Sequence, residues 1–462
     1  MQTFIDTHRS DPRKLSTKDR IQNYQEIYER YTRFKASQQA ERCIQCGDPF
    51  CSATGCPLTN HIPQWLKAVA EDDLETAFAL SNETSPFPEI LGRVCPQNKL
   101  CEGDCSLNDG WGAITIGSIE TAITELGFDH GLCVPYPGIT RDLRVAVVGS
   151  GPAGMSAAHF LLRAGIGVDM YERASHPGGL LTYGIPGFKL EKDVVKRRFA
   201  IMEQAGLRVH LNCTVGKDIL LDQLYRDYDA VFLGIGATQG RRLGLAGEDT
   251  PQVHMALDYL TAVQGKLFGD HIDKRYNVHD RRVVVVGGGD TAMDCLRTAV
   301  REGASQVTCL YRRDEANMPG STKEYISARE EGAQFHFNQS PKELLLDDSG
   351  NLYGMRFVET SMGERDADGR QKVSEVPGTE HIIEADMVIL SLGFEMEDHS
   401  FLKKEGLQLT SWGTVEVDRN QLTSHSRLFA GGDCVRGADL VVTAALDGRQ
   451  AALAIMDELL GE

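Results

Sequence analysis

Hydrophobic patterning divides the chain into two parts. Residues 1–140 contain no long β-branched run, and their short apolar repeats predict helices over residues 18–39, 62–80 and 118–126. From Leu143 onward, runs typical of buried strands alternate with helical stretches, which is the βαβ pattern of a parallel sheet. The sequence therefore predicts an α/β protein that begins with an α-helical domain.

Two strand–turn–helix units of the same form lie in the second part. Residues 145–148 and 282–286 have the composition of buried strands, and each runs directly into a glycine-rich turn. A linker with prolines and a glycine, residues 134–139, separates these units from the helical part. We expect two Rossmann-like units, which agrees with the three or so domains that a chain of 462 residues predicts.

Composition excludes several classes of partner. The formal net charge of -18 argues against nucleic acid and against an anionic membrane surface. No window is apolar enough for a membrane span, and the polar start of the chain lacks the apolar core of a secretory signal. The cysteines after residue 105 are scattered singly, as buried thiols of a reducing compartment would be. We therefore expect a cytoplasmic protein.

The first glycine-rich turn has the spacing of a dinucleotide-binding loop. Gly149, Gly151 and Gly154 form G-x-G-x-x-G, which serves the tight turn, the approach of backbone to a pyrophosphate, and close helix–strand packing. The helix N-terminus then faces the diphosphate. The next strand ends on Glu172, whose carboxylate can accept both ribose hydroxyls of an adenosine. A purely structural turn is the alternative, but strand, helix and acid together favour a nucleotide.

Two further motifs indicate that this nucleotide is FAD. Gly178-Gly179 allows a second close approach of backbone to phosphate. Residues 428–433 read as a strand that ends in Gly-Asp, a motif that in two-dinucleotide flavoproteins places the aspartate on the ribityl chain. Its simpler interpretation is an ordinary strand-to-turn ending. The candidate FAD-binding residues are Gly149, Ser150, Gly151, Pro152, Ala153, Gly154, Glu172, Arg173, Gly179, Leu180, Gly432, Asp433 and Thr443.

The second glycine-rich turn predicts a site for NADPH. The following strand, residues 306–311, ends on Arg312 and Arg313 rather than on an acid, and two guanidiniums suit the 2′-phosphate of NADP. The arginines could instead cap a solvated strand end, or pair with Asp314 and Glu315. The candidate NADPH-binding residues are Gly287, Gly288, Gly289, Asp290, Thr291, Ala292, Arg312 and Arg313.

Two nucleotide sites in one chain imply hydride transfer from a nicotinamide to a flavin. This step needs stacked rings and the exclusion of water, not a side-chain acid or base. We therefore name no catalytic residue.

The cysteines of the helical part have the spacings of iron–sulfur ligands. Cys43-x2-Cys46-x4-Cys51 and Cys101-x3-Cys105 are of this kind, and prolines follow Cys56 and Cys95. A zinc ribbon also uses C-x2-C, but a structural zinc has no use for reducing equivalents, whereas a flavin fed by NADPH needs an outlet. Seven thiolates are one short of the eight that two four-iron clusters need. The set is therefore one cluster with spare cysteines, a zinc site with spare cysteines, or two clusters with one ligand that is not cysteine.

The chain resembles the small (β) subunit family of NADPH-dependent glutamate synthase along essentially its whole length. The resemblance includes Ala40-Glu-Arg-Cys-Ile-Gln-Cys-Gly47, Gly92-Arg-Val-Cys-Pro-Gln97 and Gly287-Gly-Gly-Asp-Thr-Ala-Met-Asp-Cys295. Related modules occur in dihydropyrimidine dehydrogenase and in flavin-bifurcating transhydrogenases. One departure is the spacing of four residues between Cys51 and Cys56, where the family usually has three.

The resemblance implies two [4Fe-4S] clusters with interleaved ligands. On the family pattern, one cluster takes three cysteines of the first run and the last cysteine. The other takes the remaining three and a side chain of the following helix, at the position of Glu120, which could otherwise be an ordinary solvated helix glutamate. The implied ligands are Cys43, Cys46, Cys51 and Cys105 for the first cluster, and Cys56, Cys95, Cys101 and Glu120 for the second.

The resemblance also implies a function and a domain plan. NADPH would reduce FAD, and electrons would leave through the clusters to a glutamate synthase large subunit that makes glutamate from glutamine and 2-oxoglutarate. The alternatives are an oxidoreductase of the same build with a ferredoxin, sulfur or pyrimidine-related acceptor, and a binding module that does not turn over. We expect a bis-[4Fe-4S] ferredoxin-like domain at 1–140, an FAD-binding domain at 141–265 and 396–462, and an inserted NADPH-binding domain at 266–395.

Overall fold

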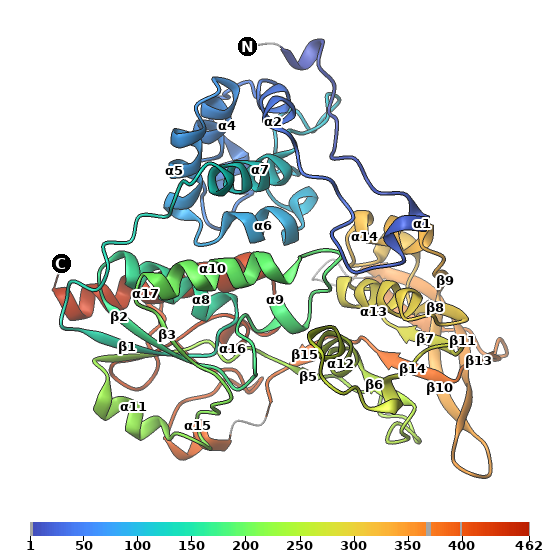
Figure 1. Cartoon of the computed structure of the whole chain (residues 1–462). Helices are drawn as coiled ribbons and strands as arrows, with labels where there is room; N and C mark the ends of the chain where they lie inside the picture. Colours follow the sequence, from blue (N-terminus) through green and yellow to red (C-terminus); the bar gives the residue numbers. More distant parts are fainter. Residues whose placement is uncertain (1–2, 366–370, 398–399, 462) are drawn as a thin grey trace.

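The computed structural model describes residues 3–365, 371–397 and 400–461. A helical N-terminal domain lies above two units, each built on a parallel sheet with helices against it (Figure 1). In this part of the chain, no helix is both long enough and apolar enough to span a bilayer.

The N-terminal domain is a small helical body with its own core. Trp65, Ile119 and Ile123 are among its fully buried side chains. Its elements are η1 (Thr3–Ile5), α1 (Thr17–Arg20), α2 (Arg33–Ala40), α3 (Phe50–Ala53), α4 (Ile62–Ala70), α5 (Leu74–Thr84), α6 (Pro88–Val94), η2 (Gln97–Lys99) and α7 (Ile116–Asp129).

The predicted helix over residues 18–39 is wrong as a single element. It is replaced by α1 and α2, and residues 21–32 between them are not helical. This segment runs as a strap that contacts both units: Ile27 N donates to Phe188 O of the first unit at 3.3 Å, and Tyr24 Oη donates to Glu302 Oε1 of the second at 2.9 Å. Tertiary hydrogen bonds of this kind satisfy the backbone as a helix would, so they override the local pattern.

The predicted helix over residues 62–80 is likewise two helices, α4 and α5. The break falls at Asp72, whose φ of 62° lies in the left-handed region. Asp73 then caps α5, since its carboxylate accepts from Thr76 N at 3.0 Å. The sequence does carry this signal, an Asp-Asp pair before a new apolar run. The third predicted helix, 118–126, lies within α7.

The first unit has a five-stranded sheet of order β16-β4-β1-β2-β3, and every pairing is parallel. Helices α8, α10 and α17 cover one face, which buries Val145 and Val147. The strand β16 comes from the end of the chain. The elements are β1 (Arg144–Val148), α8 (Pro152–Arg163), β2 (Gly167–Tyr171), α9 (Leu180–Tyr183), α10 (Lys192–Gln204), β3 (Arg208–His210), α11 (Leu221–Asp227), β4 (Ala230–Leu233), α15 (Ser400–Lys404), β16 (Leu428–Ala430), α16 (Asp433–Arg436) and α17 (Val441–Leu460).

The second unit repeats this plan with the order β6-β14-β7-β8-β9, again wholly parallel. An antiparallel sheet of β10 to β13 extends from it. The elements are β6 (Val253–Met255), α12 (Ala256–Phe268), η3 (Lys274–Tyr276), β7 (Arg282–Val286), α13 (Asp290–Arg301), β8 (Gln306–Tyr311), η4 (Glu315–Asn317), α14 (Thr322–Glu330), β9 (Gln334–Phe337), β10 (Gln339–Leu346), β11 (Leu352–Arg365), β12 (Gln371–Glu375), β13 (His381–Glu384) and β14 (Met387–Leu390).

The chain crosses between the two units at a pair of short strands. The outgoing strand β5 (Gln239–Gly240) pairs antiparallel with the returning strand β15 (Phe394–Glu395). Because β6 already belongs to the second sheet, that unit begins earlier than the expected limit at residue 266.

The N-terminal domain and the first unit share a buried boundary. Phe87 and Ile90 of the N-terminal domain belong to the same apolar core as the first sheet. Arg198 of α10 and Glu89 of α6 form an ion pair 2.5 Å long, with both side chains fully buried. Removing one partner of such a pair leaves an uncompensated buried charge, so the boundary is fixed in orientation.

Candidate functional site

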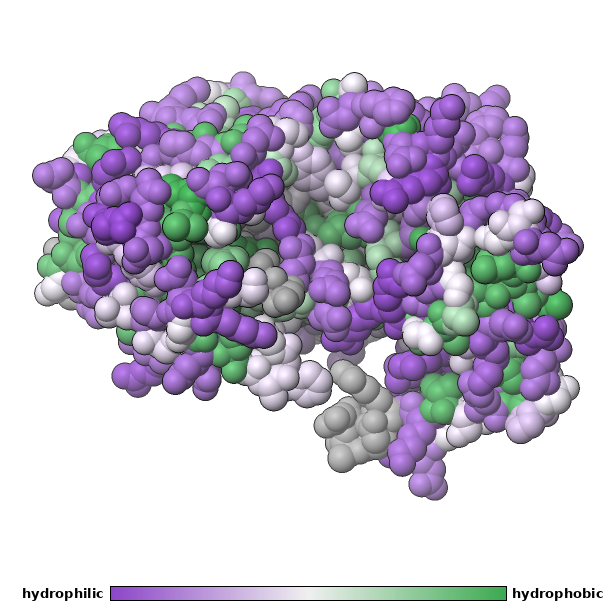
Figure 2. Space-filling view, turned by 90° about the horizontal axis from the view of Figure 1, so that it is seen from below, coloured by the Kyte–Doolittle hydropathy of each residue, from purple (hydrophilic) through white to green (hydrophobic). Residues whose placement is uncertain are grey.

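A cavity of about 670 Å³ lies at the carboxyl ends of the first unit's strands. Strands β1, β4 and β16 all end at this edge, so the turns that follow them meet there. Seen from below, hydrophobic side chains gather in the recess between the two lobes (Figure 2). The sequence-predicted residues that line the cavity are Gly149, Ser150, Gly151, Pro152, Ala153, Glu172, Arg173, Gly179, Leu180, Gly432 and Asp433.

The three glycines of the first loop have three different surroundings. Gly149 has φ 95°, and a Cβ there would lie 2.4 Å from Gly234 O. A Cβ on Gly154 would lie 2.0 Å from Gly149 O, so the helix packs against the loop more closely than any side chain allows. A Cβ on Gly151, by contrast, would have no other heavy atom within 4 Å. Its backbone is open to the cavity, as the approach of a diphosphate requires.

Glu172 is held before any ligand arrives. Ser150 N donates to Oε2 at 3.0 Å, the Ser150 hydroxyl donates to the same oxygen, and Ala174 N donates to Oε1 at 2.8 Å. A carboxylate has roughly four acceptor positions, so about one stays open. The sequence suggested that both ribose hydroxyls bind here, whereas this geometry leaves room for one.

The other polar groups predicted for this site, Asp433, Arg173 and Thr443, differ in their hydrogen-bond partners and in whether they line the cavity. Burial raises the pKa of Asp433 to about 7, and only Asp439 N approaches its carboxylate, at 3.4 Å. Arg173 is engaged in a two-pronged ion pair with Glu397 at 2.8 and 3.0 Å. Thr443 is not among the residues that line the cavity, because its hydroxyl exchanges hydrogen bonds with the backbone of Leu440 at the start of α17.

Several lining residues carried no sequence signal. Two come from segments without a motif, Thr214 after β3 and Lys404 in α15. Others, Leu257 and Thr261, belong to α12 of the second unit. The cavity therefore extends to the second unit, which local motifs could not reveal.

The second glycine loop repeats the geometry of the first. Gly287 has φ 139°, and a Cβ on it would lie 2.1 Å from Ser391 O, at the end of β14. A Cβ on the second position, Gly289, would have no other heavy atom within 4 Å. The loop is also tied from outside, since Ser321 N donates to Asp290 Oδ1 at 2.9 Å.

Arg312 and Arg313 follow β8 with their charges uncompensated. Over residues 3–365, 371–397 and 400–461, neither forms an ion pair, and the buried Nε of Arg313 has no hydrogen-bond partner. Asp314, which could have paired with them, accepts instead from Asn317 N at 3.0 Å and caps η4. Two unpaired guanidiniums therefore stand at the end of the second strand of this unit.

The cysteines of the N-terminal domain fall into two groups. We call Cys43, Cys46, Cys51 and Cys105 the outer cysteines. Burial raises the pKa of Cys51 to about 12, and the thiols of Cys105, Cys43 and Cys46 add to the rise in that order. Gln45 Nε2 donates to Cys43 Sγ at 3.3 Å and Ser106 Oγ to Cys46 Sγ at 3.7 Å. Donors to sulfur of this kind stabilise thiolate ligands.

We call Cys56, Cys95 and Cys101 the inner cysteines. Burial raises the pKa of Cys101 well above its usual value, and Glu102, Cys56, Cys95 and Glu120 add to it. All three line one small cavity together with Glu120.

Glu120 is a buried carboxylate with a single neutral partner. Burial raises its pKa to about 8, even though Asn60 Nδ2 donates to Oε1 at 2.8 Å. Since it is only 8% exposed, it is not the solvated helix glutamate of the simpler interpretation.

These groups match the chemistry of an iron–sulfur ligand set. All twelve cysteines are free thiols in the structure. Among the described residues, no three His, Cys, Asp or Glu side chains stand close enough to hold one metal ion. A four-iron cluster bonds each ligand to a different iron, so it keeps its ligands farther apart than a single zinc ion does.

The first turn of α17 separates the inner cysteines from the large cavity. Leu440, Val441 and Ala444 line the large cavity, whereas Val442 lines the cavity of the inner cysteines. One helical turn thus forms the wall between the two sites.

Two family profiles match the chain. One, described as dihydropyrimidine dehydrogenase domain II, 4Fe-4S cluster, matches residues 20–132. The other, pyridine nucleotide-disulphide oxidoreductase, matches residues 143–448.

Curated proteins of high similarity cover nearly the whole chain. The glutamate synthase [NADPH] small chain of Escherichia coli (strain K12) is 47% identical, over 99% of this chain and 98% of that protein. The one from Azospirillum brasilense is 45% identical, over 97% and 94%. The putative oxidoreductase AegA of E. coli is 46% identical over 98% of this chain, but this covers 70% of AegA.

Solved structures share the fold of the two nucleotide units. Mycobacterium tuberculosis FprA in complex with NADPH aligns with a TM-score of 0.59 and 20% identity, over 70% of this chain and 85% of that one. Lactococcus lactis thioredoxin reductase aligns with a TM-score of 0.51 and 20% identity, over 70% and 100%.

Proposed function

Because this chain belongs to the family of glutamate synthase small chains, we propose that it oxidises NADPH at FAD and delivers the electrons through two four-iron clusters to a large subunit. That subunit would make glutamate from glutamine and 2-oxoglutarate. The observation that carries the proposal is the turn of α17, which has the large cavity on one side and the inner cysteines on the other.

The large cavity suits FAD. The open Gly151 would admit the diphosphate, Glu172 would accept a ribose hydroxyl, and Asp433 would meet the ribityl chain. Bound FAD would take a hydride from NADPH and release its two electrons singly. The protein's part is placement: Leu257 and Thr261 close the cavity from the second unit and help to exclude water.

The second loop suits NADPH. Gly289 would admit its diphosphate. Arg312 and Arg313 would bind the 2′-phosphate, since no acidic side chain of the described residues forms an ion pair with them. We place the change from the FAD-binding to the NADPH-binding domain at β5 and its return at β15, where the chain crosses between the sheets.

The two cysteine groups suit two clusters in series. The inner cysteines Cys56 and Cys95 pack against the core of the first unit, whereas the outer Cys43 and Cys105 pack only within the N-terminal domain. Electrons would pass from the flavin to the inner cluster, then to the outer cluster, and then to the partner.

Iron content tests this ligand scheme. The unmodified, anaerobic protein should hold about eight irons per chain. Glu120→Ala should lower the count towards four and remove one signal in electron paramagnetic resonance, while NADPH still bleaches the flavin. Glu71→Ala, at an exposed side chain, is the control and should change nothing. Four irons in the unmodified protein would refute the two-cluster scheme.

A partner test separates this function from the second candidate. The near-equal identity to AegA favours, as that candidate, an oxidoreductase of the same build with another acceptor. Affinity purification from native cells should recover a larger subunit, and the complex should make glutamate from glutamine and 2-oxoglutarate with NADPH. Recovery of a different redox partner, without glutamate formation, would replace the first proposal by the second.

A further inference from the structure

One arginine of the first unit reaches into the N-terminal domain beside the inner cysteines. Arg449 lies on α17, two helical turns beyond the wall formed by Val441 and Val442. Its Nη1 donates to two carbonyls of the N-terminal domain, Leu58 O and Thr84 O, each at 3.0 Å. Leu58 is two residues from Cys56.

The charge of Arg449 has no counterion among the described residues. It makes no ion pair within 4.0 Å there. Leu58, whose carbonyl Arg449 holds, lines the same small cavity as the inner cysteines and Glu120. The guanidinium is therefore anchored at the edge of the inner site.

With a cluster bound, the inner site would be strongly anionic. Three thiolates and the Glu120 carboxylate would surround it, and Arg449 brings positive charge from a different domain. The outer cysteines have a comparable neighbour in Arg42, whose charge is felt by Cys105 and whose guanidinium donates only to carbonyls. Arg42, however, belongs to the same domain as the cysteines it faces.

We propose that Arg449 is a positioning residue that sets the reduction potential of the inner cluster. This inference rests on the proposed function, because it requires a cluster at the inner cysteines. Reduction adds one electron, which comes from the flavin, and hence one negative charge to the site. A fixed cation nearby favours the reduced form, so Arg449 raises the potential. The helix that walls the flavin cavity thereby makes the inner cluster a better electron acceptor.

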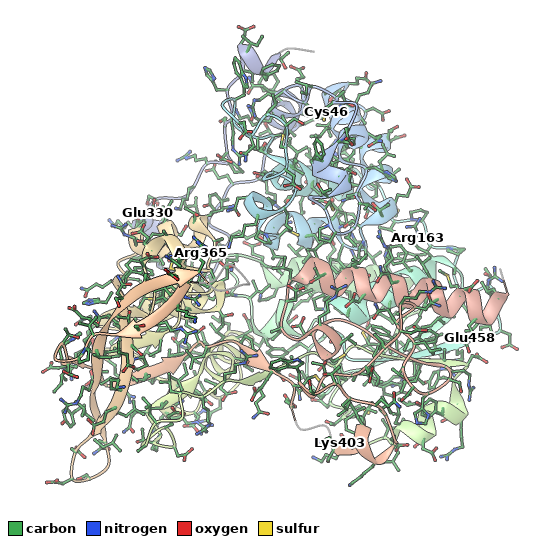
Figure 3. All side chains as sticks on the ribbon, turned by 180° about the vertical axis from the view of Figure 1, so that it is seen from behind. Cys46, Arg163, Glu330, Arg365, Lys403 and Glu458 are labelled. Atoms are coloured by element: carbon green, nitrogen blue, oxygen red, sulfur yellow. The ribbon has the colours of Figure 1, made fainter. Side chains whose placement is uncertain are left out.

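A second arginine provides a matched control. Arg163 of α8, labelled in Figure 3, also reaches from the first unit to the end of α5. Its Nη1 donates to Glu83 O at 2.9 Å and to Asn82 O at 3.3 Å, carbonyls adjacent to the one that Arg449 holds. It ties the same two domains together, but its contacts among the described residues are with carbonyls and the ring of Phe160. Arg163→Gln therefore removes a tie without removing charge from the inner site.

The experiment compares three variants of the full chain, each containing FAD and iron–sulfur clusters. Arg449→Gln, Arg449→Lys and Arg163→Gln are titrated with reductant and followed by electron paramagnetic resonance, with the outer cluster as internal reference. At a fixed potential, Arg449→Gln should lower the ratio of reduced to oxidised inner cluster about tenfold. Arg449→Lys, which keeps the charge, and Arg163→Gln should stay near the unmodified protein. Bleaching of the flavin by NADPH should be unchanged in all three.

Two results would overturn the inference. One is an unchanged inner potential in Arg449→Gln with full iron content, which would make Arg449 a tie like Arg163. The other is a change of about tenfold in the ratio of reduced to oxidised inner cluster in Arg449→Lys or in Arg163→Gln. This second result decides the matter if Arg449→Gln does not retain its iron. A chain with four irons and no inner cluster would instead refute the proposed function.

Discussion

The two nucleotide units share one backbone design and differ at two positions. In both, the first glycine of the loop packs against a carbonyl oxygen that follows a neighbouring strand. A Cβ on Gly149 would lie 2.4 Å from Gly234 O, and a Cβ on Gly287 would lie 2.1 Å from Ser391 O. In both, the second glycine is open. The third position is Gly154 in the first unit and Ala292 in the second. The residue after the second strand is Glu172 in the first unit and Arg312 in the second.

The difference shows which features serve the fold and which serve the ligand. The first two glycines meet requirements common to any dinucleotide. The third lies where the helix meets the loop: a methyl group on Gly154 would clash with Gly149 O, whereas Ala292 carries one and is fully buried. On the proposed function, the strand-end residue would set the charge presented to the ribose, a carboxylate for hydroxyls and a guanidinium for phosphate.

The largest effect is expected from exchanging the third residue of each loop. Gly154→Ala places a methyl group 2.0 Å from Gly149 O, which backbone movement alone can relieve. It should destabilise the first unit by about 3 kcal/mol or more. Ala292→Gly should cost only about 1 kcal/mol, through lost helix propensity. Urea unfolding and FAD content measure both, and similar losses in the two variants would mean that the loops are equally tight.

Next comes the acid of the first unit. Glu172→Ala removes the acceptor for a ribose hydroxyl and leaves Ser150 N and Ala174 N without their partner. FAD affinity should fall by about 2–3 kcal/mol, while NADPH still binds at the Gly287 loop. Glu172→Gln keeps an acceptor oxygen and should lose less. Flavin content by absorbance and NADPH binding by calorimetry decide the matter. Full FAD with lost NADPH binding would mean that the two sites are reversed.

The arginines of the second unit should control coenzyme choice. The double variant Arg312→Ala with Arg313→Ala should lower kcat/KM for NADPH by a factor that corresponds to about 1.5–3 kcal/mol of lost transition-state stabilisation. The value of kcat/KM for NADH should stay nearly unchanged, because NADH has no 2′-phosphate. The control is Arg356→Ala, an arginine of β11 that is engaged with Glu343 at 2.9 Å. If the unmodified protein used both coenzymes equally well, the arginines would only cap a solvated strand end.

The smallest effect concerns Asp433 and pH. In the FAD-free protein, burial holds its pKa at about 7, above the unfolded value near 3.8. A raised pKa stabilises the fold below pH 4, and this contribution is lost as the pH rises through 7. Asp433→Asn should therefore lose less stability than the unmodified protein between pH 5 and pH 8. Urea midpoints at the two pH values test this. Identical pH dependence in both proteins would mean that the Asp433 carboxylate is solvated and that burial does not raise its pKa.

Short-range features were predictable from the sequence. The strands at 282–286 and 306–311 have the bounds expected, and each glycine loop lies directly after its strand. Helix extents were less predictable, because Asp72 turns the chain in the left-handed region and the strap at residues 21–32 forms hydrogen bonds to both nucleotide units instead of a helix. Thr443 caps α17 rather than facing the cavity, and no local pattern distinguishes these two roles.

The sequence by itself determined the loops, the charges at the strand ends and the supply of thiols, because each depends on residues a few positions apart. Only the tertiary structure decided that β16 joins the first sheet, that α12 of the other unit lines the large cavity, and which cysteines stand together. Only it places Arg449 beside Cys56, 393 residues away in the chain, by the numbering. Such contacts depend on how whole helices and sheets pack, and packing is set by the sum of many side chains rather than by any motif.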